Sequence, residues 1–389
     1  MPIINRMAEL HDEVTQWRRE IHSNPELGYD VHETAANVAS KLEAFGCDEI
    51  VTGIGRTGVV GIIKGKSDSS GKVVGFRADM DALPIIEESG KPYASTTNGK
   101  MHACGHDGHT AMLLGAAKYL AETRNFDGSV AVIFQPAEEG GAGGKAMVDD
   151  GMMDRFGIDE VYGMHNLPGL DVGEFAIKPG AIMAATDEFM INLTGLGSHA
   201  AMPHLGNDPV VLAAQIILGF QTIASRNISP FEPIVVSATT IHAGTANNII
   251  PETVEITGTI RSLSEDGREL AIRRVQEITE GYCAANNATC EIKLHKGYPV
   301  TFNHAEETEK AARIAAMIAG EDRVDTNQEA TMGGEDFSYM LLERPGAFIF
   351  VGNGDTAGLH HPKYDFNDEA IPFGTSYWAK LAETLMPAS

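Results

Sequence analysis

Between residues 72 and 164, short apolar runs alternate with a long helical stretch. The runs at 73–76, 130–134 and 161–164 have the length of buried strands, and residues 110–124 have a helical pattern. Strands that are connected through helices form a parallel or mixed sheet with helices on its faces. We therefore expect an α/β domain whose functional groups lie at the carboxyl ends of its strands.

A second pattern begins near Ala185 and has the order strand, helix, strand, strand, helix, strand, which is that of a ferredoxin-like unit. Asp208 and Pro209 mark the start of its first helix. Strands are expected at 188–193, 234–241, 253–261 and 290–294, and the second helix at 265–286. We predict a discontinuous mixed-sheet α/β domain of residues 1–184 and 297–389, completed by helices at 305–319 and 369–385, and an inserted α+β domain of residues 185–296. Hinges are expected near Ala184 and Gly297.

The segment 101–109 concentrates three imidazoles and a thiol. In an extended loop, Cys104 and His106 would point to the same side, as neighbouring metal ligands do, and Gly105 would allow a close backbone approach. Thiolate and imidazole together suit zinc and other borderline metals better than magnesium or calcium. Taken alone, the segment also fits a buried cysteine beside surface histidines.

Further metal-binding side chains lie at predicted strand ends and in loops. Glu138 and Glu139 follow the run 130–134, where adjacent carboxylates project in different directions, so that one can bind a metal while the other moves a proton. His165 follows the run 161–164, and His360 lies in a C-terminal Leu-His-His-Pro segment. Together with Cys104 and His106, the side chains of Glu139, His165 and His360 provide enough ligands for two ions about 3.5–4 Å apart. The five predicted ligands are Cys104, His106, Glu139, His165 and His360.

Two glycine motifs have the spacing of nucleotide-binding loops but not their context. Residues 53–58 are followed by the strand pattern 59–63, where a pyrophosphate site requires a helix N-terminus. Gly144 and Lys145 lack both the leading glycine and the final Ser/Thr of a phosphate loop. We predict no nucleotide site.

Charge and cysteine content exclude several classes of partner. The chain has 54 acidic and 29 basic residues, a formal net charge of −25, which repels nucleic acids and anionic lipid surfaces. Its four cysteines form no disulfide pattern, which fits a reducing compartment. We find neither a signal-peptide core in residues 1–28 nor an apolar run near the roughly 18 residues that span a bilayer. We expect a cytoplasmic protein with no nucleic-acid or membrane partner.

These motifs resemble, nearly end to end, the amidohydrolase branch of the aminoacylase and carboxypeptidase superfamily of metallopeptidases. This branch includes hippurate hydrolases, N-acyl-L-amino-acid amidohydrolases and plant auxin-conjugate hydrolases. So many ordered motifs make chance agreement implausible. The matching segments are 18–28, 76–84, 104–107, 135–139, 195–200, 244–251 and 332–337.

The resemblance implies a role for each predicted site residue. It makes Cys104, His106, Glu139, His165 and His360 the metal ligands and Glu138 the general base. His361 competes with His360, but the branch usually has Leu-His-x-Pro, which favours His360. The wider superfamily has His-x-Asp where this chain has Asp79-Met80-Asp81, so the roles of Asp79 and Asp81 stay open. We prefer an orienting contact with a ligand for them.

The resemblance also identifies the inserted domain as a lid and dimerisation module. His199 would reach the active site, either its own or that of a partner subunit, and stabilise the developing oxyanion. Asn247 and Arg261 would hold the carboxylate of the substrate, with bidentate bonding by the guanidinium. A surface ion pair is the alternative for Arg261. We expect a homodimer or a higher homo-oligomer.

Together, these roles predict a metal-dependent amidohydrolase that cleaves the amide bond of N-acyl amino acids of the N-acetyl or N-benzoyl type. Two divalent ions per subunit are expected, zinc or manganese first and cobalt or nickel as alternatives. A water shared by the ions would attack the amide carbonyl while Glu138 accepts its proton. The alternatives are a dipeptidase or carboxypeptidase, and a noncatalytic metal-binding protein on the same scaffold.

Overall fold

The computed structural model describes residues 4–388, and contacts within the chain divide it into two compact units. Unit 1 consists of residues 4–182, Phe302–Glu329 and 336–388, as far as they are described, and unit 2 of Met183–Thr301 and Ala330–Glu335. The chain leaves unit 1 after Ile182 and returns to it at Phe302, whereas the sequence predicts these boundaries at residues 184 and 297. The segment Ala330–Glu335 belongs with unit 2, whereas the prediction assigned it to the first domain.

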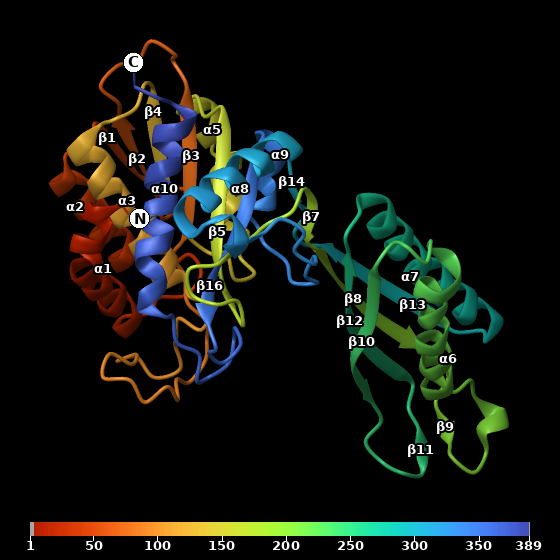
Figure 1. Ribbon diagram of the computed structural model, residues 1–389. Coiled ribbons are helices and arrows are strands. Elements are labelled where there is room, and N and C mark those ends of the chain that lie inside the picture. Colours follow the sequence, from red (N-terminus) through yellow and green to blue (C-terminus); the bar gives the residue numbers. More distant parts are fainter. Residues whose placement is uncertain (1–3, 389) are drawn as a thin grey trace. The chain divides into compact units, whose positions relative to one another are not determined.

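A mixed sheet forms the centre of unit 1 (Figure 1), with the strand order β1-β2-β4-β3-β5-β16-β6-β15 in the described chain. At its centre, β3 is parallel to β4 and β5, and β5 is parallel to β16, so the carboxyl ends of four strands lie at one edge. The mixed α/β sheet predicted from the sequence is confirmed. The strands are β1 (Glu49–Ile54), β2 (Gly58–Lys64), β3 (Val73–Asp79), β4 (Ser129–Gln135), β5 (Glu160–Pro168), β6 (Phe175–Ala176), β15 (Val324–Asp325) and β16 (Gly346–Gly354).

Helices bury both faces of the central strands, which explains why β4 is buried along its whole length. Helix α3 packs against α1 and α10, and α4 packs against α9. The helices of unit 1 are α1 (Asn5–Ser23), α2 (His32–Phe45), α3 (His106–Thr123), α4 (Gly143–Asp149), α5 (Met152–Arg155), α8 (Ala305–Ala319), α9 (Ser338–Glu343) and α10 (Ile371–Leu385).

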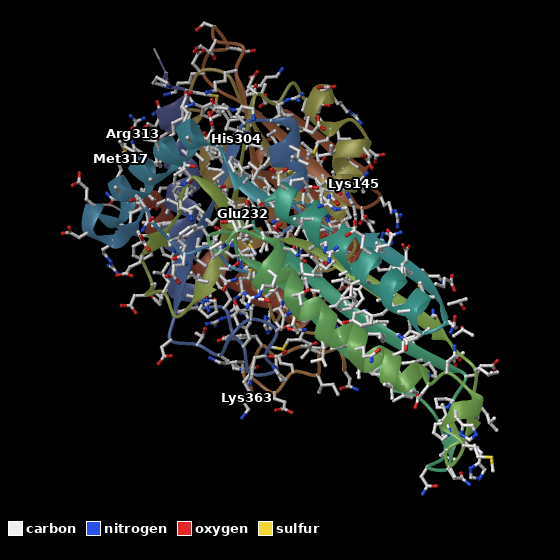
Figure 2. The ribbon with its side chains drawn as sticks, turned by 90° about the vertical axis from the view of Figure 1, so that its right-hand side faces the viewer. Lys145, Glu232, His304, Arg313, Met317 and Lys363 are labelled. Carbon is white, nitrogen blue, oxygen red and sulfur yellow. The ribbon has the colours of Figure 1, made fainter. Side chains whose placement is uncertain are left out.

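Helix α8 illustrates how the sequence sets the buried face. Ile314 and Ile318 are buried against the sheet, while Arg313 and Met317 point outward (Figure 2). Apolar residues four positions apart lie on one helical face, so this pattern fixes the side that packs.

Residues 53–58 form a turn between two strands, because β1 ends at Ile54 and β2 begins at Gly58. The strand that the sequence predicts after this glycine motif is therefore present. Short elements complete the chain: β7 (Gly180–Met183), β14 (Thr301–Asn303) and single helical turns at Pro203–Leu205, Glu321–Arg323 and Asp368–Ala370.

Unit 2 has the ferredoxin-like arrangement that the sequence predicts. Its antiparallel sheet has the order β10-β12-β8-β13 in the part of the chain described, and α6 and α7 pack against it. The side chain of Asp208 accepts hydrogen bonds from the backbone of Val210 and Val211, which starts α6 as expected. The elements are β8 (Ala185–Thr194), β9 (Ser198–His199), α6 (Pro209–Thr222), β10 (Ile234–Ala243), β11 (Ile249–Ile250), β12 (Thr253–Ser262), α7 (Glu265–Ala285) and β13 (Thr289–Lys296).

One helical segment in the described chain, Pro209–Asn227, is long and apolar enough to cross a membrane by length and composition, with a mean hydropathy of 1.3. It consists of α6 and the π-helical turn Ile223–Asn227. The prediction that no segment meets these criteria is wrong. The inner face of α6, including Leu212, Ile216 and Phe220, packs in the core of unit 2, so length and composition alone do not assign it to a membrane.

Candidate metal centre

The five predicted ligands and Glu138 all belong to unit 1, at the edge where its central strands end. Residues 138–139 follow β4, and His165 lies near the end of β5. Cys104 and His106 flank the start of α3, and His360 follows β16. The mixed sheet thus brings together segments that are far apart in the sequence.

The donor atoms of these side chains form one cluster. Within each of three overlapping groups, the nitrogen, sulfur or carboxylate oxygen atoms all lie within 4.8 Å of one another. The groups are Cys104, His106 and His165; Cys104, Glu139 and His360; and His106, Glu138 and Glu139. Because the groups share Cys104, His106 and Glu139, the structure brings together every predicted ligand and the predicted base.

Hydrogen bonds to backbone carbonyls orient two of the imidazoles. The Nδ1–H of His106 donates to the carbonyl of Asp81 at 2.8 Å, and that of His165 donates to the carbonyl of Asn166 at 2.7 Å. Each ring therefore uses Nδ1 for its carbonyl and leaves Nε2 for other partners. In His165 this atom lies 3.4 Å from Cys104 Sγ, and in His106 it is buried without a hydrogen-bond partner among the described residues. This arrangement is typical of imidazoles that bind a metal.

The carboxylate of Asp81 holds the segment that carries the two glutamates. Its oxygens accept the backbone N–H groups of Glu138 at 2.9 Å and of Glu139 at 3.1 Å. Ala137, just before them, has a left-handed φ of 53°, which turns the chain sharply after β4. Asp81 thereby fixes the backbone that carries the two neighbouring carboxylates.

His360, not His361, lies in the cluster. Its Nε2 is 3.2 Å from Glu139 Oε1, and its backbone N–H donates to the carbonyl of Ala103 at 2.8 Å. His361 is exposed, and its Nδ1 accepts the backbone N–H of Lys363 at 3.0 Å. His361 therefore points into its own turn.

Burial and neighbouring groups shift the pKa values within the cluster in both directions: despite burial, the charge of Asp79 raises the pKa of His106, and hydrogen bonds with Cys104 and Glu139 raise that of His360 to about 10. Burial lowers the pKa of His165 well below its usual value, so its ring stays neutral and can bind a metal through the lone pair of Nε2. Burial raises the pKa of the Cys104 thiol. Burial also opposes ionisation of Glu139, but a hydrogen bond from His360 and the charge of His106 outweigh it, so the pKa of Glu139 is lowered. Thiol, carboxylate and imidazole donors suit zinc and other borderline ions.

The start of α3 differs from the expectation. The sequence predicts an extended loop at Cys104–His106 and a helix from residue 110, but α3 begins at His106. Gly105 precedes it with a left-handed φ of 88°. A Cβ at Gly105 would overlap Asn166 Nδ2 and lie 2.5 Å from Tyr364 Oη, so this glycine does allow the close approach that was expected.

A further group, Asp79, His106 and His109, has the spacing of a metal site but a different bonding pattern. His109 Nε2 accepts the backbone N–H of Asn166 at 2.9 Å, and its Nδ1–H donates to Asp79 Oδ1 at 2.7 Å. His109 therefore has no lone pair left for an ion. Sequence reasoning gave no role to His109 or Asn166, although both lie in segments that it singled out.

The remaining predicted site residues, His199, Asn247 and Arg261, belong to unit 2. His199 on β9 pairs with Ile249 of β11, so the segments of His199 and Asn247 are neighbours. Arg261 lies at the other end of β12, eight residues beyond Thr253, which corresponds to about 26 Å of extended strand. Within one subunit, the structure does not bring Arg261 together with His199 and Asn247.

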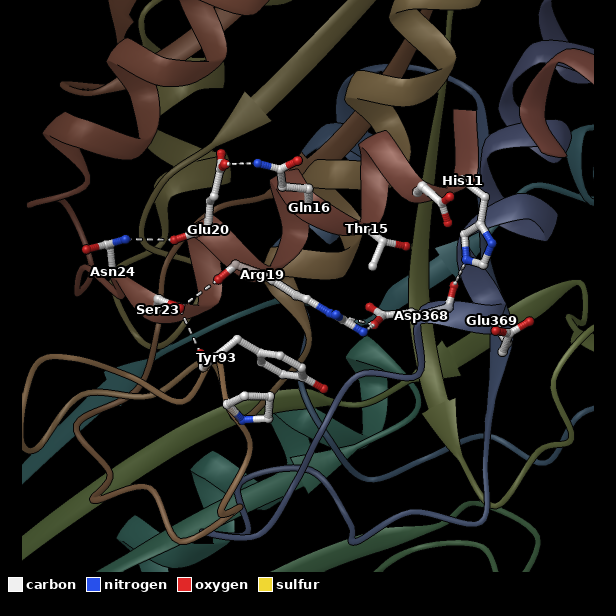
Figure 3. A pocket seen from close by; sticks show the side chains of 12 residues that line it. His11, Thr15, Gln16, Arg19, Glu20, Ser23, Asn24, Tyr93, Asp368 and Glu369 are labelled. Carbon is white, nitrogen blue, oxygen red and sulfur yellow. Dashed lines mark hydrogen bonds and ion pairs between the residues drawn. The ribbon is translucent and has the colours of Figure 1, made fainter. Parts of the chain in front are cut away.

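A separate cavity of about 640 Å³ lies beside α1 (Figure 3). Its walls come from α1, residues 92–93 and the turn at 368–369. Arg19 crosses it to donate a hydrogen bond to Asp368 at 2.7 Å and lies over the ring of Tyr93. The predicted ligands and the predicted base are not part of these walls.

Comparison with known proteins gives matches over nearly the whole chain. Residues 75–384 match peptidase family M20/M25/M40. A hippurate hydrolase of Campylobacter jejuni is 42% identical over 385 residues, 98% of this chain and 99% of that protein. A thermostable carboxypeptidase of Saccharolobus solfataricus is 41% identical, covering 97% and 96% of the two chains. The crystal structure of the YXEP protein of Bacillus subtilis, a dinuclear metal-binding peptidase of the M20 family, has a TM-score of 0.84 and 34% identity, covering 97% and 99%.

Proposed function

The chain belongs to peptidase family M20/M25/M40 and is a hydrolase that acts on amide bonds, and we propose that its substrates are N-acyl amino acids of the N-acetyl or N-benzoyl type. Hippurate hydrolase and N-acetylcysteine deacetylase are the names of relatives that are 42% and 37% identical to it. Both names denote release of an amino acid from an acyl group.

The observation that carries the proposal is the position of Glu138 in the donor cluster. Its carboxylate lies within 4.8 Å of the donor atoms of His106 and Glu139, and its backbone is fixed by Asp81. A carboxylate that neighbours the ligands without being needed as one is suited to move a proton. A protein that only stored metal would gain nothing from it.

We assign the ions to Cys104, His106, Glu139, His165 and His360, of which Cys104, His106 and His165 are buried and His106 and His165 are oriented by backbone carbonyls. Two divalent ions, when bound, would supply a water of lowered pKa and polarise the amide carbonyl. Zinc fits these donors, and manganese, cobalt and nickel are the alternatives.

The chain's own groups perform the proton transfers. A carboxylate oxygen of Glu138 accepts a proton from the attacking water and then delivers it to the nitrogen of the leaving amine, which departs only when protonated. His199 donates to the carbonyl oxygen as negative charge develops there. Asn247 and the guanidinium of Arg261 hold the substrate's carboxylate.

We propose a homodimer in which each site combines residues of both subunits. Within one subunit, Arg261 lies near the end of β12, whereas His199 on β9 pairs with β11 just before β12 begins, so a site that uses both needs His199 of the partner subunit. Exposed apolar side chains on α6, namely Val210, Val211 and Leu218, offer a surface for the partner.

A carboxypeptidase activity is the second candidate, because the carboxypeptidase relative is almost as similar to the chain as the hippurate hydrolase is. Both activities require recognition of a free carboxylate next to the amide bond. They differ in the group on the acyl side of that bond, which is an acetyl or benzoyl group in an N-acyl amino acid and an amino-acid residue in a peptide. We place the protein in the cytoplasm, in keeping with four cysteines that are all free thiols.

The test is release of free amino acid from N-acetyl amino acids, N-benzoyl amino acids and dipeptides by the purified protein. The protein is stripped of metal and then resupplied with zinc or manganese. Metal-dependent release from the N-acyl compounds supports the proposal, and preference for dipeptides supports the carboxypeptidase. Absence of release with every metal, despite stoichiometric binding, contradicts both.

Glu138→Gln tests the proton transfer. We expect it to lower kcat about 10²–10⁴-fold, because an amide cannot accept the proton, and to keep the metal content of the unmodified protein. Glu139→Gln serves as the contrast, since loss of a ligand should lower the metal content itself. Turnover in Glu138→Gln equal to that of the unmodified protein would rule out the assigned role.

A further inference from the structure

A chain of buried hydrogen bonds runs from β3 to the segments that carry three of the proposed ligands. Arg77 Nη1 donates to Asp79 Oδ2 at 2.7 Å, and Asp79 Oδ1 accepts the Nδ1–H of His109 at 2.7 Å. On the other side of the ring, Nε2 accepts the backbone N–H of Asn166 at 2.9 Å. Arg77, Asp79 and Asn166 are completely buried, and His109 is 2% exposed.

Asp79 Oδ2 lies 3.7 Å from His106 Nε2, and Asn166 connects the chain to the other ligands. Its side-chain Nδ2 donates to the carbonyl of Cys104 at 2.6 Å, and its own carbonyl accepts the Nδ1–H of His165. Its Oδ1 accepts the hydroxyl of Tyr364 at 2.8 Å, four residues after His360. A shift of Asn166 would therefore displace Cys104 and His165 together.

The direction of every hydrogen bond in the chain is determined. A backbone N–H can only donate, so His109 Nε2 must be the acceptor and its ring must be neutral with the proton on Nδ1. Asp79 is the partner that selects this tautomer, because a carboxylate only accepts. Burial lowers the pKa of His109, which keeps the ring neutral.

We propose that Asp79 and His109 are positioning residues: Asp79 fixes the tautomer of His109, and His109 in turn fixes Asn166 and, through it, Cys104 and His165. This inference rests on the proposed metal site but goes beyond it, since neither residue binds the ions. It also gives Asp79 a role different from that of Asp81, which holds the glutamates directly.

The substitution Asp79→Asn tests the direction of the chain. Arg77 is a donor, so the new amide must turn its oxygen toward Arg77 and its NH₂ toward His109 Nδ1. The His109 proton then moves to Nε2, where it faces the N–H of Asn166, and two donors oppose each other. We expect metal affinity to fall about 10–100-fold, the range found when a partner of a ligand is lost.

The first readout is the tautomer itself, measured from the ¹⁵N chemical shifts of the His109 ring in the zinc-loaded protein. We expect the proton on Nδ1 in the unmodified protein and on Nε2 in Asp79→Asn. The second readout is zinc affinity by competition with a chelator. Thr110→Val is the matched control, because Thr110 donates to the backbone carbonyl of Asp79 at 2.7 Å and is equally buried, but lies outside the chain.

A proton on Nε2 in the unmodified protein, or unchanged zinc affinity in Asp79→Asn, would overturn the inference. If Asp79→Asn fails to fold, His109→Asn tests the affinity readout, since it removes the acceptor of the Asn166 backbone N–H and should weaken zinc binding to a similar extent, while the tautomer is measured in the unmodified protein. Both readouts are independent of hydrolysis. A protein that shows the tautomer and the affinity loss but cleaves no amide would contradict the proposed function alone.

Discussion

Gly105→Ala should disrupt the metal centre although the substitution adds a single methyl group. The left-handed φ of 88° costs alanine about 1–2 kcal/mol. The new Cβ would also overlap Asn166 Nδ2 and lie 2.5 Å from Tyr364 Oη, which adds about 1–3 kcal/mol of overpacking. Displacement of Asn166 breaks its hydrogen bond to the Cys104 carbonyl, worth about 1 kcal/mol.

These contributions total about 3–6 kcal/mol. If the segment around Gly105 moves to relieve the strain and the overlap, Cys104 and His106 leave their positions. The free energy of metal binding then becomes less favourable by about the same amount. Since 1.4 kcal/mol corresponds to a factor of ten, zinc affinity should fall more than 100-fold. If the segment around Gly105 keeps its place, the free energy of unfolding of the metal-free protein falls by the same amount.

Two measurements separate these outcomes: zinc affinity by chelator competition, and the free energy of unfolding of the metal-free protein. The matched control is Gly99→Ala, because Gly99 has a φ of 83° but nothing within 4 Å of its ideal Cβ. It should cost only the backbone strain, about 1 kcal/mol, and leave zinc affinity unchanged. A Gly105→Ala protein with normal affinity and normal stability would refute the reasoning.

Two further predictions concern pH and assembly. Burial lowers the pKa of His22, but Asp107 at 2.8 Å and Glu87 at 3.2 Å outweigh burial and raise this pKa to about 9. Protonated His22 therefore stabilises the folded state by on the order of 3 kcal/mol. This stabilisation is complete below pH 6.5 and is lost as pH rises through 9. Urea unfolding at pH 6 and pH 10 should show a smaller difference for His22→Asn than for the unmodified protein, and equal differences would contradict this account. For the homodimer, a mixture of inactive Glu138→Ala and inactive His199→Ala subunits should regain about a quarter of the activity, since half of the dimers would be mixed and contain one intact site. No recovery after verified subunit exchange would place His199 in its own subunit's site.

Local patterns were sufficient to predict most of the fold. The apolar runs predicted the strands at the centre of unit 1, and the cap at Asp208 and the alternating burial of β8 predicted unit 2, because these signals act within one element. The start of α3 could not be predicted in this way. The space that excludes a side chain at Gly105 is filled by Asn166 and Tyr364, which are distant in the sequence.

The candidate site was predicted only as far as its donor atoms. Histidines, a cysteine and glutamates at strand ends indicate ligands, since those residue types carry the chemistry. The hydrogen-bond chain through His109 depends on contacts between residues 57 positions apart, such as its bond to Asn166. No local pattern reports the tautomer of an imidazole, because the partner of each nitrogen decides it.

The discontinuous course of unit 1 has a consequence for the protein's synthesis on the ribosome. Strand β16 lies between β5 and β6 in the finished sheet, but it is translated only after the whole of unit 2. Unit 2 is nearly continuous in sequence and can fold as soon as it emerges, whereas β5 must wait with one edge unpaired. His360 emerges later still, so a nascent chain cannot assemble the full donor set. With the proposed ligands, hydrolytic activity can therefore begin only after the segment of His360 has been translated and has joined β5.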